Sequence, residues 1–336
     1  PMGVSAEYMV LFVFFASILA NTGMGKLFND VSLGVAGRSA GGPAKVAVIS
    51  SGLVGMINGG AAANVATTGA LTIPLMKRTG YKPHFAGAVE AAASTGGQIM
   101  PPIMGTVAFI MSEFTGIPYI KIAAAAAIPA ILYFASVYFA VDFRAKNSGL
   151  IGLDESEIPD YMSSVKKYWH MLLPIFLLVY LLITQHSAMY SAFYALIATL
   201  VLSFIKASTR MSSKQFFAIT GLGLIIADNI ILLSGGKLFI ILILVMFVSI
   251  ILGMGLPTSA CYVIATSICA AILRDAGVAV LQANMFILYY ACLSTITPPV
   301  ALASYVAAGI SGANPNKVGW TAFRLAIAGF IIPFFF

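Results

Sequence analysis

Residues 85–102 read FAGAVEAAASTGGQIMPP, and this stretch decides how the rest of the chain is interpreted. The apolar run from Phe85 to Thr95 predicts a helix, and the glycine pair at 96–97 followed by Pro101-Pro102 predicts that this helix stops. Glycine frees the backbone φ angle, while proline lacks an N–H donor and disfavours helix at the residue before it. The apolar run resumes from Ile103 to Met111. We therefore expect a helix that is broken in its middle.

The composition places this broken helix in a membrane. Of 336 residues, 60% are hydrophobic and 9% are charged, and the mean hydropathy is +0.98. A soluble globular domain carries roughly 25% charged residues, so a water-soluble fold is excluded. Runs such as Ala123 to Val141 and Met189 to Ile205 approach the length of about 20 residues that crosses a bilayer. In hydrocarbon, a helix break is tolerated only where its backbone groups are buried in protein or line a wet cavity.

The charge pattern describes topology and does not indicate a nucleic acid partner. The net charge is +7, but the basic residues lie in short connectors at 77–82, 144–167 and 206–214. By the positive-inside rule, these connectors lie in the cytoplasm.

The three cysteines lie in apolar segments without a C-x-x-C pair, so we expect no disulfide framework, no zinc site and no cofactor.

The chain repeats itself at an offset of 197 to 198 residues. Pro101-Pro102 recurs as Pro298-Pro299, and the pattern of residues 22–25 (TGMG) recurs at 220–223 (TGLG). Between these anchors, residues 55–60 (GMINGG) match residues 252–257 (LGMGLP). Paired interruptions at matching positions of two halves indicate a transporter binding site.

Two re-entrant hairpins are expected, one in each half. The limb from Ala44 to Ile57 has about 14 residues, or roughly 21 Å, which is too short to cross comfortably. A second limb, Ala61 to Met76, returns to a basic connector, so residues 44–76 form a hairpin with both ends on one side. Residues 238–275 form the counterpart, which we expect to open to the opposite face.

The predicted fold is an all-α integral membrane protein of two inverted-topology repeats. Its expected layout is a first repeat at 1–121 with a scaffold helix, the hairpin at 44–76 and a broken helix at 85–111; connecting scaffold helices at 122–215; and a second repeat at 216–336 with the hairpin at 238–275, a broken helix at 284–310 and a truncated last helix. A membrane helix expected before Thr220 is missing. The chain begins at Pro1 and stops within an apolar run at Phe336, so we expect a fragment of a longer membrane protein.

Hairpin tips and helix breaks that face each other offer ligands to ions and to a carboxylate. Helix N-termini supply N–H groups to anions and C-termini supply carbonyls to cations, and hard cations such as sodium accept backbone and hydroxyl oxygens. The candidate ion ligands are Asn58, Gly59, Gly97 and Pro101 in one half and Gly255, Thr258, Ser294 and Thr297 in the other. The candidate substrate ligands are Asn64, Thr67, Thr68, Gln98, Ser259 and Thr295.

The structural alternative for these glycines is close packing of helices, which is routine in membrane bundles. The presence of two copies of a Gly-rich tip with a Pro-Pro break favours a binding site over close packing alone.

Glu90 is the acidic residue most clearly inside a predicted membrane helix, and intramembrane carboxylates indicate function, so Glu90 is a candidate proton carrier. An ion pair between Glu90 and Lys77, Arg78 or Lys82 is an equal alternative.

The three histidines lie at the edges of connectors, which indicates interfacial anchoring over metal binding. They are His84, His170 and His186.

Five motifs occur in one order along most of the chain: 41–45 (GGPAK), 73–81 (IPLMKRTGY), 87–102 (GAVEAAASTGGQIMPP), 252–258 (LGMGLPT) and 296–302 (ITPPVAL). In these motifs the chain resembles the large permease subunit of the tripartite ATP-independent periplasmic (TRAP) transporters, in the fused form that works with a TAXI-type binding protein. The missing helix before Thr220 departs from that family's pattern.

The resemblance implies an elevator mechanism, in which a mobile domain of two hairpins and two broken helices slides against a scaffold. It implies import of a small organic acid, delivered by a periplasmic TAXI-type binding protein, across a bacterial inner membrane. Coupling to Na+ is implied, with H+ as the alternative that would employ Glu90. The alternatives are an ion channel, which needs a continuous pore, or another membrane carrier, and least of all an intramembrane enzyme, since the H-E-x-x-H motif is absent.

Overall fold

The chain is helical wherever the structure describes it. The computed structural model describes residues 15, 18–184, 186–203 and 238–336, and within them no β-strand occurs, which confirms the predicted all-α class. The α-helices are α2 (Gly25–Ala36), α3 (Gly42–Asn58), α4 (Ala61–Arg78), α5 (Pro83–Gly97), α6 (Val107–Thr115), α7 (Tyr119–Asn147), α8 (Tyr161–Tyr168), α9 (Leu173–Ile183), α10 (Ala188–Ser203), α12 (Leu238–Gly253), α13 (Thr258–Asp275), α14 (Val280–Leu293), α15 (Leu302–Ser311), α16 (Pro315–Leu325) and α17 (Ile327–Ile331). Shorter elements are the π-helix η1 (Ala20–Met24) and the 3-10 helices η2 (Glu155–Glu157), η3 (Trp169–Leu172), η6 (Ser294–Ile296) and η7 (Ile332–Phe335).

The motif at 220–223 and the position of the helix expected before Thr220 lie outside the described residues.

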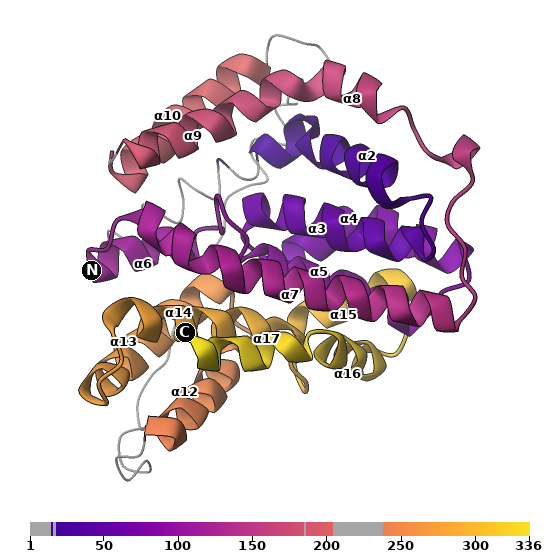
Figure 1. The fold of residues 1–336 in the computed structure, drawn as a ribbon. Coiled ribbons are helices and arrows are strands. Elements are labelled where there is room, and N and C mark those ends of the chain that lie inside the picture. Colours follow the sequence, from indigo (N-terminus) through magenta and orange to yellow (C-terminus); the bar gives the residue numbers. More distant parts are fainter. Residues whose placement is uncertain (1–14, 16–17, 185, 204–237) are drawn as a thin grey trace.

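Helices α3 and α4 form an antiparallel hairpin around the predicted tip. Gly59 adopts a φ of 65° and ends α3, and the extended Gly60 then allows α4 to begin. The Ser51 hydroxyl oxygen lies 3.0 Å from that of Thr68, and the Asn64 side-chain amide donates to the Ser51 carbonyl at 2.8 Å. These contacts pair residues before the tip with residues after it, so the two helices run in opposite directions (Figure 1).

Helix α5 ends at the break that its sequence predicts. Pro83 occupies its first turn, where the missing N–H donor costs nothing, and the helix ends at Gly97. Turns occupy residues 98–106 before α6 begins. Within them, Met104 has a φ of 56° and Gly105 a φ of 61°. A positive φ is uncommon for a residue with a side chain, so the packing around Met104 must stabilise its backbone conformation.

The second half contains the same succession of elements. Helices α12 and α13 pack on each other and are joined by a turn in which Gly255 has a φ of 85°. Helix α14 leads through η6 into a break at 297–301, after which α15 begins. Ala301 in this break has a φ of 35°, and it stands 197 residues after Met104. The peptide bonds Pro101–Pro102 and Pro298–Pro299 are both cis.

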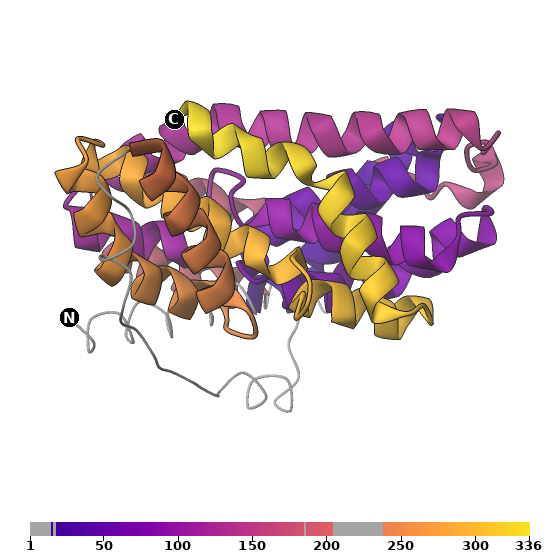
Figure 2. The same cartoon turned by 90° about the horizontal axis from the view of Figure 1, so that it is seen from below.

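The helices form two regions. In Figure 1, α8, α9 and α10 lie on one side of the molecule, and α2 lies between them and the first hairpin, packing on α3 and α8. The other helices surround the two breaks, where α4 packs on α15 and α5 packs on α16, so the halves are interleaved. Helix α7 packs on α3, α5 and α6, and α17 lies alongside it (Figure 2).

Within the described residues, two helical segments are long and apolar enough to cross a membrane: Tyr119–Asn147 and Glu155–Ile183. A pair bent by 63°, Pro315–Leu325 and Ile327–Phe335, passes the same criterion as one span. The limbs of the second hairpin and the halves of the broken helices are shorter than the roughly 20 residues that cross a bilayer.

Candidate functional site

The tip of the first hairpin packs directly on the break after α5. A methyl group at Gly97 would lie 2.6 Å from the Cα atom of Gly55, and one at Gly59 would lie 2.8 Å from the Cα atom of Gly105. The Gly105 N–H donates to the Met56 carbonyl at 3.2 Å. Backbone touches backbone at these crossings, so only glycine fits there.

The second hairpin crosses its own break in a comparable way. A methyl group at Gly253 would lie 2.5 Å from the Cβ atom of Ser294 and 2.9 Å from the sulfur of Cys261. The Cys261 thiol in turn donates to the Ser249 carbonyl at 3.3 Å. The contacting residues follow those of the first unit by 197 or 198 positions, in the pairs Gly55 and Gly253, Asn64 and Cys261, Gly97 and Ser294, and Ser51 and Ser249.

The two breaks also meet each other. The hydroxyl oxygens of Thr95 and Thr295 lie 3.1 Å apart, and both residues are buried. A threonine at the end of α5 thus contacts a threonine in η6, so the two interruptions form one junction inside the protein. This burial provides the protein environment that broken helices need in hydrocarbon.

A tyrosine supports each break from outside it. The Tyr119 hydroxyl lies 2.6 Å from the Pro102 carbonyl and 2.7 Å from the Ile103 carbonyl. The Tyr305 hydroxyl donates to the Pro299 carbonyl at 2.5 Å. These bonds satisfy carbonyl groups that the interrupted helices leave without a helical partner.

Glu90 is fully buried and is held by four hydroxyl groups. Ser51 of α3 donates to one carboxylate oxygen at 2.6 Å, Thr72 of α4 donates to the other at 2.5 Å, and Thr68 of α4 donates as well. Ser94, one turn further along α5, lies 3.2 Å from the same oxygen as Ser51. The carboxylate therefore joins both limbs of the first hairpin to α5.

No basic side chain pairs with Glu90 among the described residues. Lys77 donates instead to the Ser311 carbonyl at the end of α15, at 2.8 Å, and Arg78 pairs with Glu157 at 2.5 Å. The predicted alternative of an ion pair between Glu90 and Lys77, Arg78 or Lys82 is therefore wrong, because these side chains reach out of the bundle from the helix ends while Glu90 points into it.

The candidate ion ligands of the first half gather at the tip–break contact. Gly97 and Gly59 make the crossings described above, Asn58 precedes Gly59 at the end of α3, and Pro101 lies within the break. Among those of the second half, Ser294 contacts the tip, and its hydroxyl donates to the Ala291 carbonyl at 2.7 Å. The remaining ones lie around it: Thr297 in the break, and Gly255 and Thr258 in the turn and at the start of α13. Whether they bind an ion stays a prediction.

The candidate substrate ligands separate into different environments. Thr67 is exposed and donates to its own helix, while its neighbour Thr68 is buried against Glu90. Thr295 contacts Thr95 at the junction of the breaks. Ser259 is buried at the start of α13.

Two of these candidates carry buried polar atoms with no hydrogen-bond partner among the described residues. Asn64 is fully buried and its side-chain oxygen is unpaired, and Gln98 is 2% exposed with both side-chain polar atoms unpaired. Unpaired buried polar groups are costly and require an explanation such as a water, an ion or a ligand. Both lie where the first tip meets the first break.

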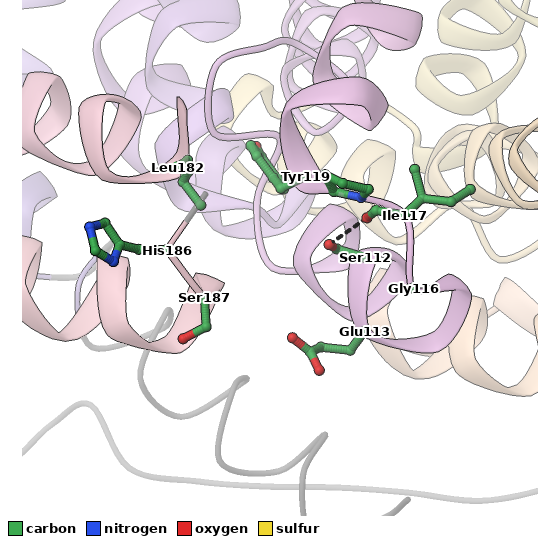
Figure 3. A pocket seen from close by; sticks show the side chains of 9 residues that line it. Ser112, Glu113, Gly116, Ile117, Tyr119, Leu182, His186 and Ser187 are labelled. Atoms are coloured by element: carbon green, nitrogen blue, oxygen red, sulfur yellow. Dashed lines mark hydrogen bonds between the residues drawn. The ribbon is translucent and has the colours of Figure 1, made fainter. Parts of the chain in front are cut away.

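A separate cavity of about 280 Å³ lies where the α6–α7 turn approaches the α9–α10 turn. Figure 3 shows Ser112 and Glu113 on one side of it and His186 and Ser187 on the other. Its lining residues are Ser112, Glu113, Gly116, Ile117, Pro118, Tyr119, Leu182, His186 and Ser187, so none of the candidate ion or substrate ligands takes part.

Features of an enzyme or a metal centre do not assemble in the described part of the chain. No group of three His, Cys, Asp or Glu side chains could hold a metal ion there. Residues 37–41 (GRSAG) match the G-x-S-x-G pattern, but they form the turn between two helices, and the Ser39 hydroxyl donates to the Ala36 carbonyl at 2.8 Å. The strand-to-helix turn that exposes a serine nucleophile is missing at this position.

Sequence reasoning missed the hydroxyl partners of Glu90, which are Ser51, Thr72 and Ser94. A signal was present, because Thr68 and Thr72, and likewise Glu90 and Ser94, are spaced four residues apart and so share a helix face. Nothing in the local sequence shows, however, that these two faces and Ser51 meet.

Comparison with known proteins finds a family match along both halves of the chain. The sequence profile of the DctM component of tripartite ATP-independent periplasmic transporters matches residues 1–215 and 207–336. Over 329 residues the chain is 22% identical to the 2,3-diketo-L-gulonate TRAP transporter large permease protein of Escherichia coli (strain K12), with 89% of this chain and 76% of the relative covered. Over 168 residues it is 24% identical to the C4-dicarboxylate TRAP transporter large permease protein of Pseudomonas aeruginosa, with 50% of this chain and 39% of the relative covered.

Matches to relatives from Haemophilus influenzae and Sinorhizobium fredii cover 39% and 34% of their lengths, so the aligned part of the chain is less than half of these proteins. The family profile, in contrast, accounts for both halves of the chain. The chain therefore belongs to the DctM component family of the tripartite ATP-independent periplasmic transporters.

Proposed function

We propose that this chain is the permease part of an ion-coupled secondary transporter that imports a small organic acid delivered by a periplasmic binding protein. The relatives are transporter permeases, which removes the intramembrane enzyme as an alternative. The observation that carries the proposal is the paired crossing of hairpin tip and helix break, with Gly55 on Gly97 in one unit and Gly253 on Ser294 in the other. Interrupted helices that meet at one junction are the usual construction of a transporter binding site.

We further propose that the two units are inverted-topology repeats with re-entrant hairpins, and that they move together as an elevator. Matching contacts at an offset of 197 to 198 residues, and positive φ angles at both Met104 and Ala301, support the repeat. The interleaving of α4 with α15 and of α5 with α16 supports movement as one body. The sequence alone predicts that residues 122–215 belong to the scaffold. We keep that assignment for α8, α9 and α10 and change it for α7, which we assign to the moving body because it packs on α3, α5 and α6.

The proposed coupling ion is Na+ at the two tip–break crossings, and a specific observation favours H+ as the second candidate. Thr68 and Thr72 can each donate to Glu90 or to a backbone carbonyl, because their hydroxyl oxygens lie 2.8 Å from the Asn64 carbonyl and 3.1 Å from the Thr68 carbonyl. An ionised Glu90 accepts from these hydroxyls. A protonated Glu90 donates to a hydroxyl oxygen, whose own proton turns to the carbonyl. All groups stay hydrogen-bonded in both states, as a proton carrier requires.

The proposed substrate is a carboxylate and the proposed location is a bacterial inner membrane. The E. coli and P. aeruginosa relatives are named for 2,3-diketo-L-gulonate and C4-dicarboxylates, both of them small organic acids. The unpaired side-chain atoms of Asn64 and Gln98 provide N–H and carbonyl groups at the tip that a polar substrate or its coupling ion could use. A binding protein of the TAXI type is the proposed partner.

The test is uptake into proteoliposomes by the full-length permease with its binding protein, using succinate and 2,3-diketo-L-gulonate as probes. Sodium and proton gradients are imposed separately, and Glu90→Gln is compared with Glu155→Gln, an equal change at an exposed carboxylate that pairs with Arg38. Uptake driven by sodium alone and retained in Glu90→Gln supports the backbone sites. Uptake driven by protons alone and lost only in Glu90→Gln makes Glu90 the carrier, and no uptake under either gradient contradicts transport of these acids.

A further inference from the structure

Four basic groups gather at the end of the molecule where α5 and α16 begin and α7 ends. Lys82 precedes α5, His84 lies in its first turn, Arg144 lies in the last turn of α7, and Lys317 lies in the first turn of α16. Lys82, Arg144 and Lys317 are exposed, and His84 is half-buried between them. We call these four residues the basic cluster.

Helix packing fixes the position of the basic cluster. A methyl group at Gly87 would lie 3.4 Å from a methyl carbon of Val318 and 3.1 Å from the Ser311 hydroxyl, so the N-terminal part of α5 contacts the start of α16 and the end of α15. The Arg144 guanidinium lies 5.7 Å from the centre of the Phe85 ring, a cation–π distance that joins the end of α7 to the same place. The charges are therefore brought together by the core of the fold and not by mobile loops.

The basic cluster has no acidic counterpart in the described part of the chain. None of its members takes part in an ion pair there, and the nearby Asp142 is occupied by Lys45 at 2.6 Å and Lys146 at 2.7 Å. The pKa of His84 lies below its usual value because of burial and then because of the charges of Lys317, Lys82 and Arg144. Three positive charges thus remain without compensation on one small area.

Exposed aromatic side chains adjoin the basic cluster in the sequence. Trp320 follows Lys317 by one turn of α16 and is 54% exposed, and Phe143 precedes Arg144 and is 63% exposed. Aromatic side chains beside basic ones are typical of the boundary between a bilayer and water. The headgroup region is where uncompensated basic residues find negative charge.

We propose that Lys82, Arg144 and Lys317 form a binding site for the phosphate group of an anionic phospholipid, with Trp320 and Phe143 against its acyl chains. This inference rests on the proposed membrane arrangement, in which the basic connectors lie at one membrane surface. Charge complementarity selects the ligand: a guanidinium can bind a phosphate through two parallel N–H bonds, and the two lysines add point charges. A zwitterionic lipid would leave the cluster uncompensated.

The experiment uses Trp320 as the reporter. The chain has two tryptophans, so the Trp169→Phe variant leaves Trp320 as the only one. This protein is reconstituted into phosphatidylcholine vesicles that contain equal mole fractions of either dibrominated phosphatidylglycerol or dibrominated phosphatidylcholine, and the quenching of tryptophan fluorescence is measured. We expect at least about tenfold enrichment of the anionic lipid near Trp320, because several basic groups act together. The triple variant Lys82→Gln, Arg144→Gln, Lys317→Gln should lower this enrichment to about onefold.

Two control variants separate the site from general charge and from misfolding. Lys26→Gln, Lys121→Gln, Arg274→Gln removes the same charge elsewhere and should keep the enrichment, as should the charge-preserving Lys82→Arg, Arg144→Lys, Lys317→Arg. Equal quenching by both lipids in the parent, unchanged enrichment in the glutamine triple variant, or loss of enrichment on adding inorganic phosphate would overturn the proposal. Quenching by neither lipid would instead contradict the membrane arrangement on which it rests.

Discussion

The two hairpin–break units share their geometry but not their chemistry. At the crossings, the positions of Gly55 and Gly97 correspond to those of Gly253 and Ser294. Around Glu90 the correspondence ends. The positions that match Glu90, Thr68, Thr72 and Ser94 at an offset of 197 hold Ile287, Ala265, Cys269 and Ala291. The contrast shows that the crossing of tip and break depends on small residues at the contact and does not require a buried polar network.

One residue of the second unit still carries the polar pattern of the first. Ser249 matches Ser51, which donates to Glu90, and its hydroxyl is buried without a hydrogen-bond partner among the described residues. At the position that corresponds to Glu90, the second unit has the apolar Ile287. The first unit therefore concentrates the titratable chemistry, and the second provides a comparison within the same chain.

The largest effect is expected from placing a carboxylate in the second unit. Ile287→Glu would bury a charge where Ala265, Cys269 and Ala291 replace three of the four hydroxyl donors, so we expect a loss of about 3–5 kcal/mol in the free energy of unfolding. The measurement is the temperature at which the purified protein loses its monodisperse peak in detergent. Ile287→Leu is the matched control. An unchanged melting temperature for the glutamate variant would mean that the second unit supplies donors after all.

The two crossings should respond to exchange of their residues by different amounts. Gly97→Ser puts a Cβ atom 2.6 Å from the Gly55 Cα atom, so we expect it to cost about 1–3 kcal/mol in the free energy of unfolding. Ser294→Gly makes the second crossing like the first and should cost less. Thermal unfolding of both variants, beside Gly309→Ser at a position with open space, measures the difference. Equal destabilisation of both variants would contradict the inference that the first crossing tolerates a side chain less well than the second.

Replacing Glu90 by the residue of the second unit should have a smaller effect. In Glu90→Ile, Thr68 and Thr72 can turn to backbone carbonyls, so mainly Ser51 and Ser94 lose a partner, and we expect a loss of about 1–2 kcal/mol in stability. Adding Ser51→Ala and Ser94→Ala removes the two stranded donors and should restore much of the lost stability. Thermal unfolding of the single and triple variants tests this, and no recovery would show that the network also shapes the packing.

The smallest effects concern the tyrosines beside the breaks. Tyr119 is 5% exposed and Tyr305 is 38% exposed, so the hydrogen bonds of Tyr119 are better shielded from water than that of Tyr305. We expect Tyr119→Phe to lower the free energy of unfolding by about 1 kcal/mol and Tyr305→Phe by less than about 0.5 kcal/mol. Chemical denaturation of both variants in the same detergent gives the ranking, and the reverse order would contradict it.

The interruptions of the helices could be predicted from the sequence because glycine and proline act on the local backbone. The tips at Gly59 and Gly255 and the breaks at 98–106 and 297–301 lie where these residues indicated. The placement of α7 could not be predicted, since in a membrane protein both lipid-facing and protein-facing sides are apolar and hydropathy does not distinguish them.

The candidate site could be predicted only in part. The cost of placing a carboxylate in a membrane helix singles out Glu90, but its hydroxyl partners come from three helices. The local sequence does not show that these three helices pack together. The positive φ angles of Met104 and Ala301 had no local signal either, because neither residue favours that conformation.

The contact between Lys77 and the Ser311 carbonyl has a consequence for biosynthesis. The two residues are separated by 234 positions, and ribosomes add about 5–20 residues per second, so the first hairpin waits roughly 10–50 seconds for this partner. During that interval the sides of α4 and α5 that later receive α15 and α16 lack these partners. Synthesis of α15 and α16 is thus the step that completes the packing around the first hairpin and α5.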